Sequence, residues 1–314
     1  MMVPAVLLLL GALTAVLAPR LLARAQWTER EPVVALWAWQ CVVGAVLLCF
    51  ALSMVFSAAA AWLAVRGRLF AAAPHGVVDA YGLGPTGGPW AVGTALLLAG
   101  GGLWTGVRLA REVLRARAGR RARGAELLVR APLLPGEAPA PGARLVVLEG
   151  PRPDAWWLPG PAPQLVVTTA ALGRLKGSQL DAVLAHEQGH AAARHDWLLH
   201  CARALAGGFP QVPVFAAFEA EMHRLVELAA DDVASRRFGR LTIALALVGL
   251  NEDRGVFGPS PAPQPHVPER VRRLLSATPR LSPVRRLRLT ALATLVPAVP
   301  LLVAFVPGLR ALAQ

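Results

Sequence analysis

The stretch that decides the fold reads Ala185-His186-Glu187-Gln188-Gly189-His190. Apolar side chains recur at helical spacing on both sides of it, and Ser178 offers an N-cap, so the sequence predicts a helix that begins there. On such a helix His186 and His190 stand one turn apart, and both imidazoles therefore point the same way. Two neutral imidazoles on one helix face make half of a tetrahedral zinc site, with Glu187 beside the water that the metal activates.

A zinc site of this kind needs a third protein ligand, and the sequence narrows where it can come from. A metzincin would carry a glycine and then a third histidine just downstream, but Ala193 and Asp196 stand at those places. Residues 219–234 predict a second helix, on which Glu227 and Asp231 stand four residues apart. Glu227 can then be the third ligand, while Asp231 accepts a hydrogen bond from the ring nitrogen of a ligand histidine that does not bind the metal. The two motifs together favour a zinc hydrolase over a solvated polar helix face.

Composition separates this chain from ordinary soluble domains. It has 314 residues, of which 55% are hydrophobic and only 16% are charged, and its mean hydropathy is +0.49. Membrane spans explain these values most simply. The three cysteines include no Cys-x-x-Cys pair, so neither a thiolate zinc site nor a disulfide framework is indicated.

Four apolar runs are long enough to be membrane spans: residues 3–24, 33–65, 90–109 and 289–306. The first has a rival interpretation as a cleaved signal peptide, because residues 21–25 resemble a signal-peptidase site. No basic residue precedes that run, whereas arginines follow it, which is the charge order of a retained anchor. The chain is therefore predicted to be an α-helical membrane protein with four spans.

The basic residues predict how these spans are oriented. The net charge is +13, and a dense run of arginines from Arg108 to Arg123 follows the third span. No aromatic residue interleaves them and they adjoin a span, so we favour a cytoplasmic, lipid-facing segment over a nucleic-acid-binding arm. The domain after this run is then cytoplasmic, and both termini lie outside a cell membrane. No direct contact with nucleic acid is expected.

This topology divides the chain into three segments. Residues 1–124 form a membrane domain, residues 125–283 a cytoplasmic zinc metallopeptidase domain, and residues 284–314 the fourth span with a short tail. The middle segment is predicted to be α+β and zincin-like, because strand patterns precede the helices that carry the two zinc motifs. The predicted strands are residues 126–130, 144–148, 155–158 and 164–169.

The third of these strands is the candidate substrate-binding edge. It is apolar and comes shortly before the helix with the two ligand histidines, and a peptide substrate can bind as an added strand. The residues concerned are Ala155, Trp156, Trp157 and Leu158. For the two tryptophans, anchoring at the membrane surface or plain core packing are equally good interpretations. Three further histidines are interpreted as core or surface residues rather than ligands: His195, His200 and His223.

Five segments with recognisable motifs follow one another along the chain: residues 155–160, 165–169, 180–190, 194–196 and 227–231. In this order they resemble the integral-membrane gluzincins of the BlaR/MecR type, in which three spans, a cytoplasmic zinc domain and a fourth span occur in succession. The HtpX/CAAX-protease family is similar and shares both zinc motifs. The resemblance implies one zinc ion per chain, held by His186, His190 and Glu227, with Glu187 as the catalytic residue.

One further detail extends this resemblance and another limits it. Residues 266–274 resemble the HPP-x-x-x-R element of the HtpX/CAAX-protease family. Beyond the predicted fourth span there is no room for a penicillin-binding sensor, so sensing of beta-lactams is not expected to carry over.

These patterns predict a membrane-embedded zinc metalloendopeptidase that hydrolyses peptide bonds of cytoplasmic or membrane-associated proteins. Its expected partners are a protein or peptide substrate and the lipid bilayer. Two biological roles stay open: cleavage of a cytoplasmic transcriptional repressor in signalling, or HtpX-like quality control of membrane proteins. A non-catalytic membrane scaffold is disfavoured, because Glu187 is present and a structural zinc site would fill its fourth position with protein.

Overall fold

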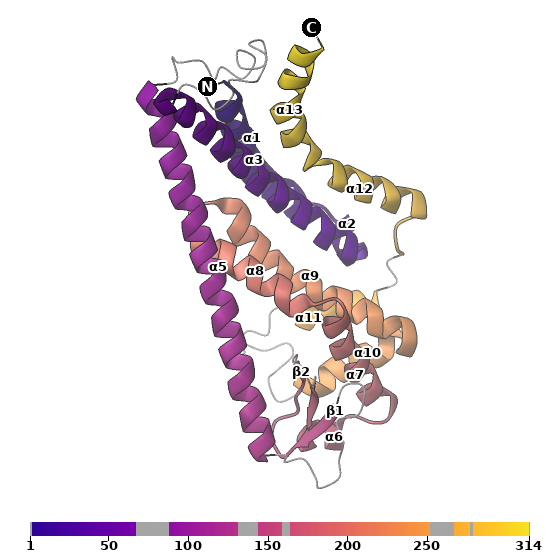
Figure 1. The fold of residues 1–314 in the computed structure, drawn as a ribbon. Helices are drawn as coiled ribbons and strands as arrows, with labels where there is room; N and C mark the ends of the chain where they lie inside the picture. Colours follow the sequence, from indigo (N-terminus) through magenta and orange to yellow (C-terminus); the bar gives the residue numbers. More distant parts are fainter. Residues whose placement is uncertain are drawn as a thin grey trace. The chain divides into compact units, whose positions relative to one another are not determined.

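The computed structural model describes residues 2–66, 88–130, 144–158, 164–251, 267–276 and 279–313 (Figure 1). The chain splits into two compact units, which are described separately. The first unit comprises residues 1–110, 202–220 and 281–314, and the second comprises residues 111–201 and 221–280. Three helices contribute residues to both units: α5 (Gly88–Arg130), α8 (His195–Gly208) and α9 (Pro213–Phe238).

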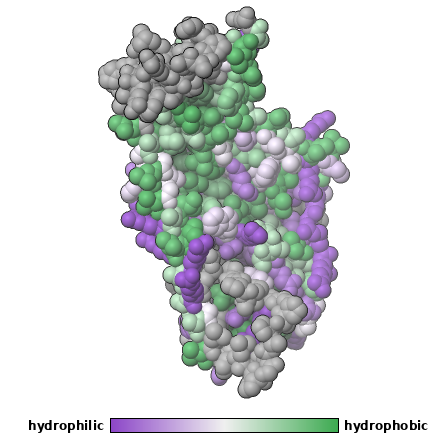
Figure 2. All heavy atoms as spheres, in the orientation of Figure 1, coloured by the Kyte–Doolittle hydropathy of each residue, from purple (hydrophilic) through white to green (hydrophobic). Residues whose placement is uncertain are grey.

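The first unit contains the most apolar helices of the chain. Helix α1 (Met2–Ala23) packs along α3 (Pro32–Arg66), and the short helix α2 (Trp27–Arg30) connects them. Leu7 and Trp39 are fully buried between helices, whereas Leu9 and Leu13 on the outer side of α1 are exposed. Figure 2 shows apolar side chains gathered over the surface of this unit. Exposed leucines on a helix suit a lipid environment better than water.

Within the described residues, two helices are long and apolar enough to cross a membrane, namely residues 2–23 and 32–59. They coincide with the first two predicted spans and indicate that the protein associates with a membrane. The third predicted span lies in α5, which is not among these helices. The four-span arrangement therefore stays a prediction.

The fourth predicted span is broken rather than continuous. Helices α12 (Pro283–Leu295) and α13 (Ala298–Leu312) meet at an angle of 47°, and they reach the length of a span only as a pair. The break falls where Pro297 and Pro300 lack the backbone N–H groups that a continuous helix would donate to its preceding turn.

The strand predicted at residues 126–130 is wrong, because α5 continues as a helix to Arg130. The preceding residues are mostly arginine, alanine, leucine and glutamate, which are good helix formers. A single β-branched residue, Val129, does not reverse that preference. The other three predicted strands are present.

The second unit contains a three-stranded sheet with the order β1-β3-β2. Strand β1 (Arg144–Leu148) runs parallel to β3 (Gln164–Thr168), and β2 (Ala155–Leu158) runs antiparallel to β3. Among the described strands β2 is therefore at an edge. Its outer side has backbone groups that another chain can pair with.

The chain turns from the sheet into the helix with the two ligand histidines. The Thr168 hydroxyl accepts a hydrogen bond from the N–H of Ala171 and caps α6 (Thr169–Arg174). Helix α7 (Ser178–Ala192) follows, and its N-cap is Gly177 rather than the predicted Ser178. Gly177 has a φ of +39°, which a residue with a side chain adopts only under strain. The glycine therefore sets where α7 begins.

Three more helices complete the core around α7. Helix α10 (Arg240–Asn251) is apolar but too short to span a membrane, and it packs against α7. Helix α11 (Val267–Leu275) packs against α10 through Val267, Val271 and Leu274, which are all buried. This core holds α7, α9 and α11 in the relative positions on which the site depends.

Candidate metal centre

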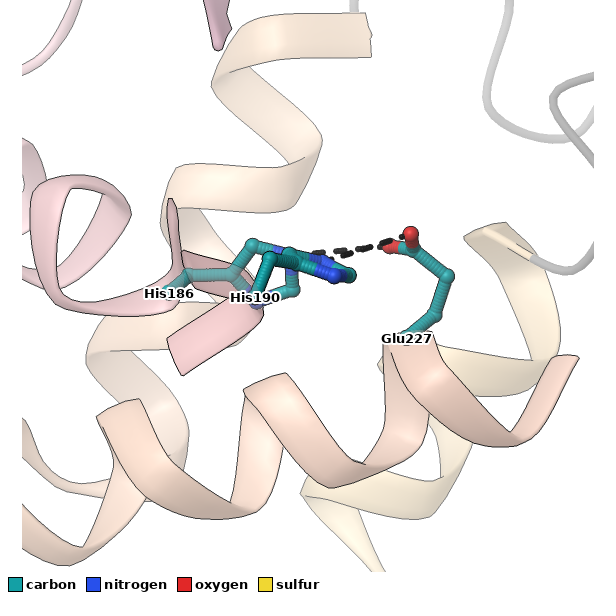
Figure 3. A group of neighbouring side chains, drawn as sticks. All are labelled: His186, His190 and Glu227. Atoms are coloured by element: carbon teal, nitrogen blue, oxygen red, sulfur yellow. Dashed lines mark hydrogen bonds and ion pairs between the residues drawn. The ribbon is translucent and has the colours of Figure 1, made fainter. Parts of the chain in front are cut away.

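Two helices of the second unit bring three candidate metal ligands together. Helix α7 places His186 and His190 one turn apart, and α9 contributes Glu227. Figure 3 shows both imidazoles pointing toward the Glu227 carboxylate. The candidate ligand atoms of the three residues all lie within 4.8 Å of one another.

The distances within this cluster fit a cation. Nε2 of His186 lies 3.1 Å from Nε2 of His190. One oxygen of Glu227 lies 3.5 Å from the His186 nitrogen, and the other lies 3.4 Å from the His190 nitrogen. Two imidazole nitrogens this close need a proton or a cation between them, because their lone pairs would otherwise repel each other. Two imidazoles and one carboxylate form a donor set that Zn²⁺ prefers.

Asp231 lies behind His186, one helical turn after Glu227 on α9. Its side chain is fully buried, and its Oδ1 lies 3.0 Å from Nδ1 of His186. Burial lowers the pKa of His186, but the bonds to Asp231 and Glu227 outweigh that effect and raise the pKa to about 9. The Nδ1 nitrogen is thereby occupied, and Nε2 faces the cluster.

The ring of His190 contacts a second histidine, His195, on the side away from the cluster, and the sequence analysis did not predict this contact. Nδ1 of His195 lies 2.9 Å from Nδ1 of His190, and His195 is only 4% exposed. If His190 donates this hydrogen bond, its Nε2 keeps a lone pair for a metal. Burial, as the largest cause, lowers the pKa of His190 to about 3 and that of His195 to about 4, so both are neutral.

The position of His195 depends on the turn that precedes it. Arg194 has a φ of +52°, a left-handed conformation that is uncommon for a residue with a side chain. This turn ends α7 and starts α8, and it directs His195 back toward His190. The sequence left open whether His195 is a core or a surface residue; it is buried, and its contact with His190 was missed.

Arg270 is the largest omission of the sequence reasoning. It lies on α11, is 6% exposed, and donates two hydrogen bonds to Asp231, at 2.8 Å from Nε and 2.7 Å from Nη2. Its third nitrogen lies 2.6 Å from Oε2 of Glu227. The sequence did offer one indication of Arg270, namely the resemblance of residues 266–274 to a known element. That resemblance assigned no role to the arginine. His266 lies outside the described residues.

Arg270 keeps both neighbouring carboxylates ionised. Burial is the largest single effect and raises the pKa of Glu227 and Asp231, but the positive charge of Arg270 and the contacts with His186 together outweigh it in both cases. As a result the pKa of Glu227 lies well below its usual range, and that of Asp231 is about 2. A negatively charged Glu227 is the form that binds a metal.

Glu187 lies beside the cluster and points toward the edge strand. Its Oε2 accepts a hydrogen bond from the backbone N–H of Trp157 on β2, at 3.2 Å. Burial raises the pKa of Glu187 to about 7, although the charge of His186 and the bond from Trp157 act against it. A carboxyl group with a pKa near 7 can take up and return a proton at neutral pH.

A cavity of about 360 Å³ opens beside the cluster. Three of the four predicted substrate contacts line it: Ala155, Trp156 and Trp157. Leu158 does not, because it is only 6% exposed and packs into the apolar core between the sheet strands. His195 lines the cavity as well, whereas His200 and His223 do not.

The comparisons with known proteins agree with this geometry over part of the chain. No curated protein and no solved structure matches the sequence. Residues 133–207, which include α7 and its two histidines but end before Glu227, match the model described as Peptidase family M48. This match indicates a metallopeptidase.

Proposed function

We propose that this protein is a membrane-embedded zinc metalloendopeptidase, with His186, His190 and Glu227 as the zinc ligands. The observation that carries the proposal is the cluster itself. Its three ligand atoms lie within 4.8 Å of one another, and the remaining ring nitrogen of each histidine is already engaged, by Asp231 and His195. One zinc ion per chain would complete this arrangement.

The ligand set fits a catalytic rather than a structural zinc site. Catalytic sites use three protein ligands and leave a further position for water or substrate, whereas structural sites fill all four with protein. Zinc bound here would lower the pKa of a water molecule and polarise the scissile carbonyl. Among the described residues, no fourth histidine, cysteine or carboxylate joins the three-residue cluster.

Glu187 is the proposed general base. It is close enough to the cluster for the charges of His186 and Glu227 to affect its pKa, and it lines the same cavity. With a pKa of about 7 it takes a proton from the attacking water and returns it to the leaving amine. The bond from Trp157 fixes the direction in which the carboxylate points.

The proposed substrate is a protein or peptide that pairs with the edge of β2. The N–H of Trp157 bonds to Glu187 and is therefore turned away from β3. The free edge of β2 thus faces the catalytic residues, and a peptide added to that edge would cross the cluster. Ala155, Trp156 and Trp157 are the proposed contacts, while the burial of Leu158 argues for a supporting role.

The proposed setting is a cell membrane crossed four times, with the catalytic domain in the cytoplasm and both termini outside. The apolar faces of α1 and α3 support association with the bilayer. Arginines in α5 and the exposed Arg285, Arg286 and Arg288 on α12 support the orientation, because basic residues stay on the cytoplasmic side. The same side chains can contact anionic lipid headgroups.

The biological role follows from which proteins are cut. The resemblance to the BlaR/MecR type favours signalling by cleavage of a transcriptional repressor, and the HtpX-like alternative is quality control of membrane proteins. Comparison of new protein N-termini in cells with the wild-type chain and with Glu187→Ala separates the two. A single repressor cut only by the wild type would support signalling, whereas many membrane-protein fragments would support quality control.

Metal content and activity together test the proposed chemistry. The full chain, purified in detergent, should hold one zinc and cleave an unfolded protein substrate. Glu187→Gln should keep the zinc and lose cleavage, whereas His186→Ala or Glu227→Ala should lose both. Full zinc content in Glu227→Ala would refute the assignment of the third ligand.

A further inference from the structure

Two ion pairs join α9 to α11 next to the metal cluster. Asp231 and Asp232 are consecutive residues of α9, and Arg270 and Arg273 stand about one turn apart on α11. Arg270 donates two hydrogen bonds to Asp231. Arg273 donates one from Nη2 to Oδ1 of Asp232, at 2.9 Å. The two helices are therefore attached to each other at two points.

Asp232 also accepts a hydrogen bond from a second arginine. Nη2 of Arg280, in the segment that follows α11, lies 3.2 Å from Oδ2 of Asp232. The Asp232 side chain is 11% exposed and that of Arg273 is 15% exposed, whereas that of Arg280 is 42% exposed. Because water screens an exposed pair more strongly, the contact with Arg273 is the stronger of the two.

Apolar packing constrains the position of α11 only loosely. Val267, Val271 and Leu274 bury one face of this nine-residue helix in the core. Hydrophobic contacts have no preferred direction, so they limit sliding and rotation of a short helix less strictly than hydrogen bonds do. The short, charge-assisted bonds of Arg270 and Arg273 supply that direction.

The position of α11 matters because Arg270 contacts the metal cluster. Its three nitrogens contact Glu227 and Asp231 at 2.6 to 2.8 Å, and Asp231 in turn lies 3.0 Å from Nδ1 of His186. A displacement of α11 by about 1 Å would stretch these contacts beyond hydrogen-bond range. Asp232 itself does not line the cavity, so its effect on a bound metal would pass through α11.

We propose that Asp232 is a positioning residue of the metal centre. Through Arg273 it holds α11 against α9 and thereby keeps Arg270 in contact with Glu227 and Asp231. The inference rests on the proposed zinc site. Asp232→Asn preserves the size of the side chain but removes its charge, and it should weaken zinc binding about tenfold.

A double-mutant cycle tests whether Asp232 acts through Arg270. The zinc dissociation constant of the full chain in detergent is measured by competition with a chromophoric chelator. Asp232→Asn should weaken binding about tenfold in the wild-type background but less than about twofold in an Arg270→Met background, where the residue that it positions is gone. A general loss of stability would weaken binding by the same factor in both backgrounds.

A second cycle does not depend on the folding of the Arg270 variant. If Asp232 acts through Arg273, the double variant Asp232→Asn with Arg273→Gln should bind zinc within about twofold of either single variant. Additive losses would show that the two residues act separately and would overturn the proposal.

Glu221 provides a matched control on the same helix. It pairs with Arg224 at 2.9 Å within α9, and the two side chains are 22% and 14% exposed. Glu221→Gln removes the same charge and one ion pair without changing a contact to α11. It should leave the zinc dissociation constant unchanged, and a loss equal to that of Asp232→Asn would overturn the proposal.

The results distinguish failure of the inference from failure of the proposed function. A wild-type chain that binds no zinc would overturn the proposed function, and the inference with it. A wild-type chain that binds zinc no more tightly than Asp232→Asn would overturn the inference alone. Equal losses in the wild-type and Arg270→Met backgrounds would do the same.

Discussion

Replacement of Arg270 by methionine removes the positive charge next to Glu227 and Asp231 while keeping most of the apolar stem. In the metal-free protein, Asp231 would lose two hydrogen bonds of 2.7 and 2.8 Å, and its side chain has no exposure to water. Removing one partner of a buried ion pair typically costs about 3–5 kcal/mol. Loss of the ion pair between Arg270 and Glu227 adds about 1 kcal/mol or less to this destabilisation, because the Glu227 side chain is 33% exposed and water partly screens the pair.

This loss should appear in the thermal unfolding of the metal-free chain. For a unit of this size, each kcal/mol lowers the Tm by about 2–4 °C, so we expect a decrease on the order of 10 °C. Arg270→Lys should recover only part of it, since an ammonium group cannot reproduce the two-pronged contact with Asp231. Zinc affinity should fall about 10–100-fold in the methionine variant, because Glu227 and Asp231 lose the group that orients them.

Arg272 provides the matched control for this experiment. It lies on the same helix and is exposed, so Arg272→Met should change the stability by no more than about 0.5 kcal/mol. If the two methionine variants unfolded at the same temperature, the contacts of Arg270 would contribute nothing to stability. The argument that this residue holds the ligand set in place would then be refuted.

Three further predictions concern protons, positioning and topology. Zinc binding at pH 7 should release about one proton, because His186 with its raised pKa of about 9 carries a proton that ligation displaces. Zinc affinity should therefore rise with pH up to about 9; calorimetry that detects no proton release would contradict this. His195→Leu should weaken zinc binding about 10–100-fold, whereas His195→Asn, which retains an acceptor for His190, should weaken it less. Equal losses in the two variants would indicate that His195 acts on His190 through packing alone. Reporter fusions after Gly124 and at the C-terminus should report cytoplasmic and outside locations, and an outside signal after Gly124 would reverse the proposed orientation.

The parts of the site that could be predicted from the sequence are those that depend on one helix at a time. The spacing of His186 and His190 on α7, and of Glu227 and Asp231 on α9, places each pair on a common face whatever the rest of the fold does. The strand at 155–158 likewise required only a short apolar run bounded by proline and glycine residues. Local sequence patterns were sufficient for these elements.

The parts that could not be predicted depend on backbone details or on tertiary packing. The segment 126–130 fits a strand or a helix equally well over so short a length, and its continuity with α5 decided the outcome. His195 reaches His190 only because Arg194 adopts a left-handed conformation, which the sequence does not signal for an arginine. Leu158 is buried because of what covers its strand, which periodicity alone does not specify.

Arg270 shows what electrostatic reasoning can predict from the sequence and what it cannot. Glu227 and Asp231 are two like charges one turn apart on a helix, and the second is fully buried. Such a pair is unfavourable unless a cation compensates it, and zinc contacts only the first carboxylate in the proposed assignment. Asp231 therefore requires a buried counter-charge of its own. The chain has 32 lysine and arginine residues, and only the packing of α11 against α10 identifies which of them meets that requirement.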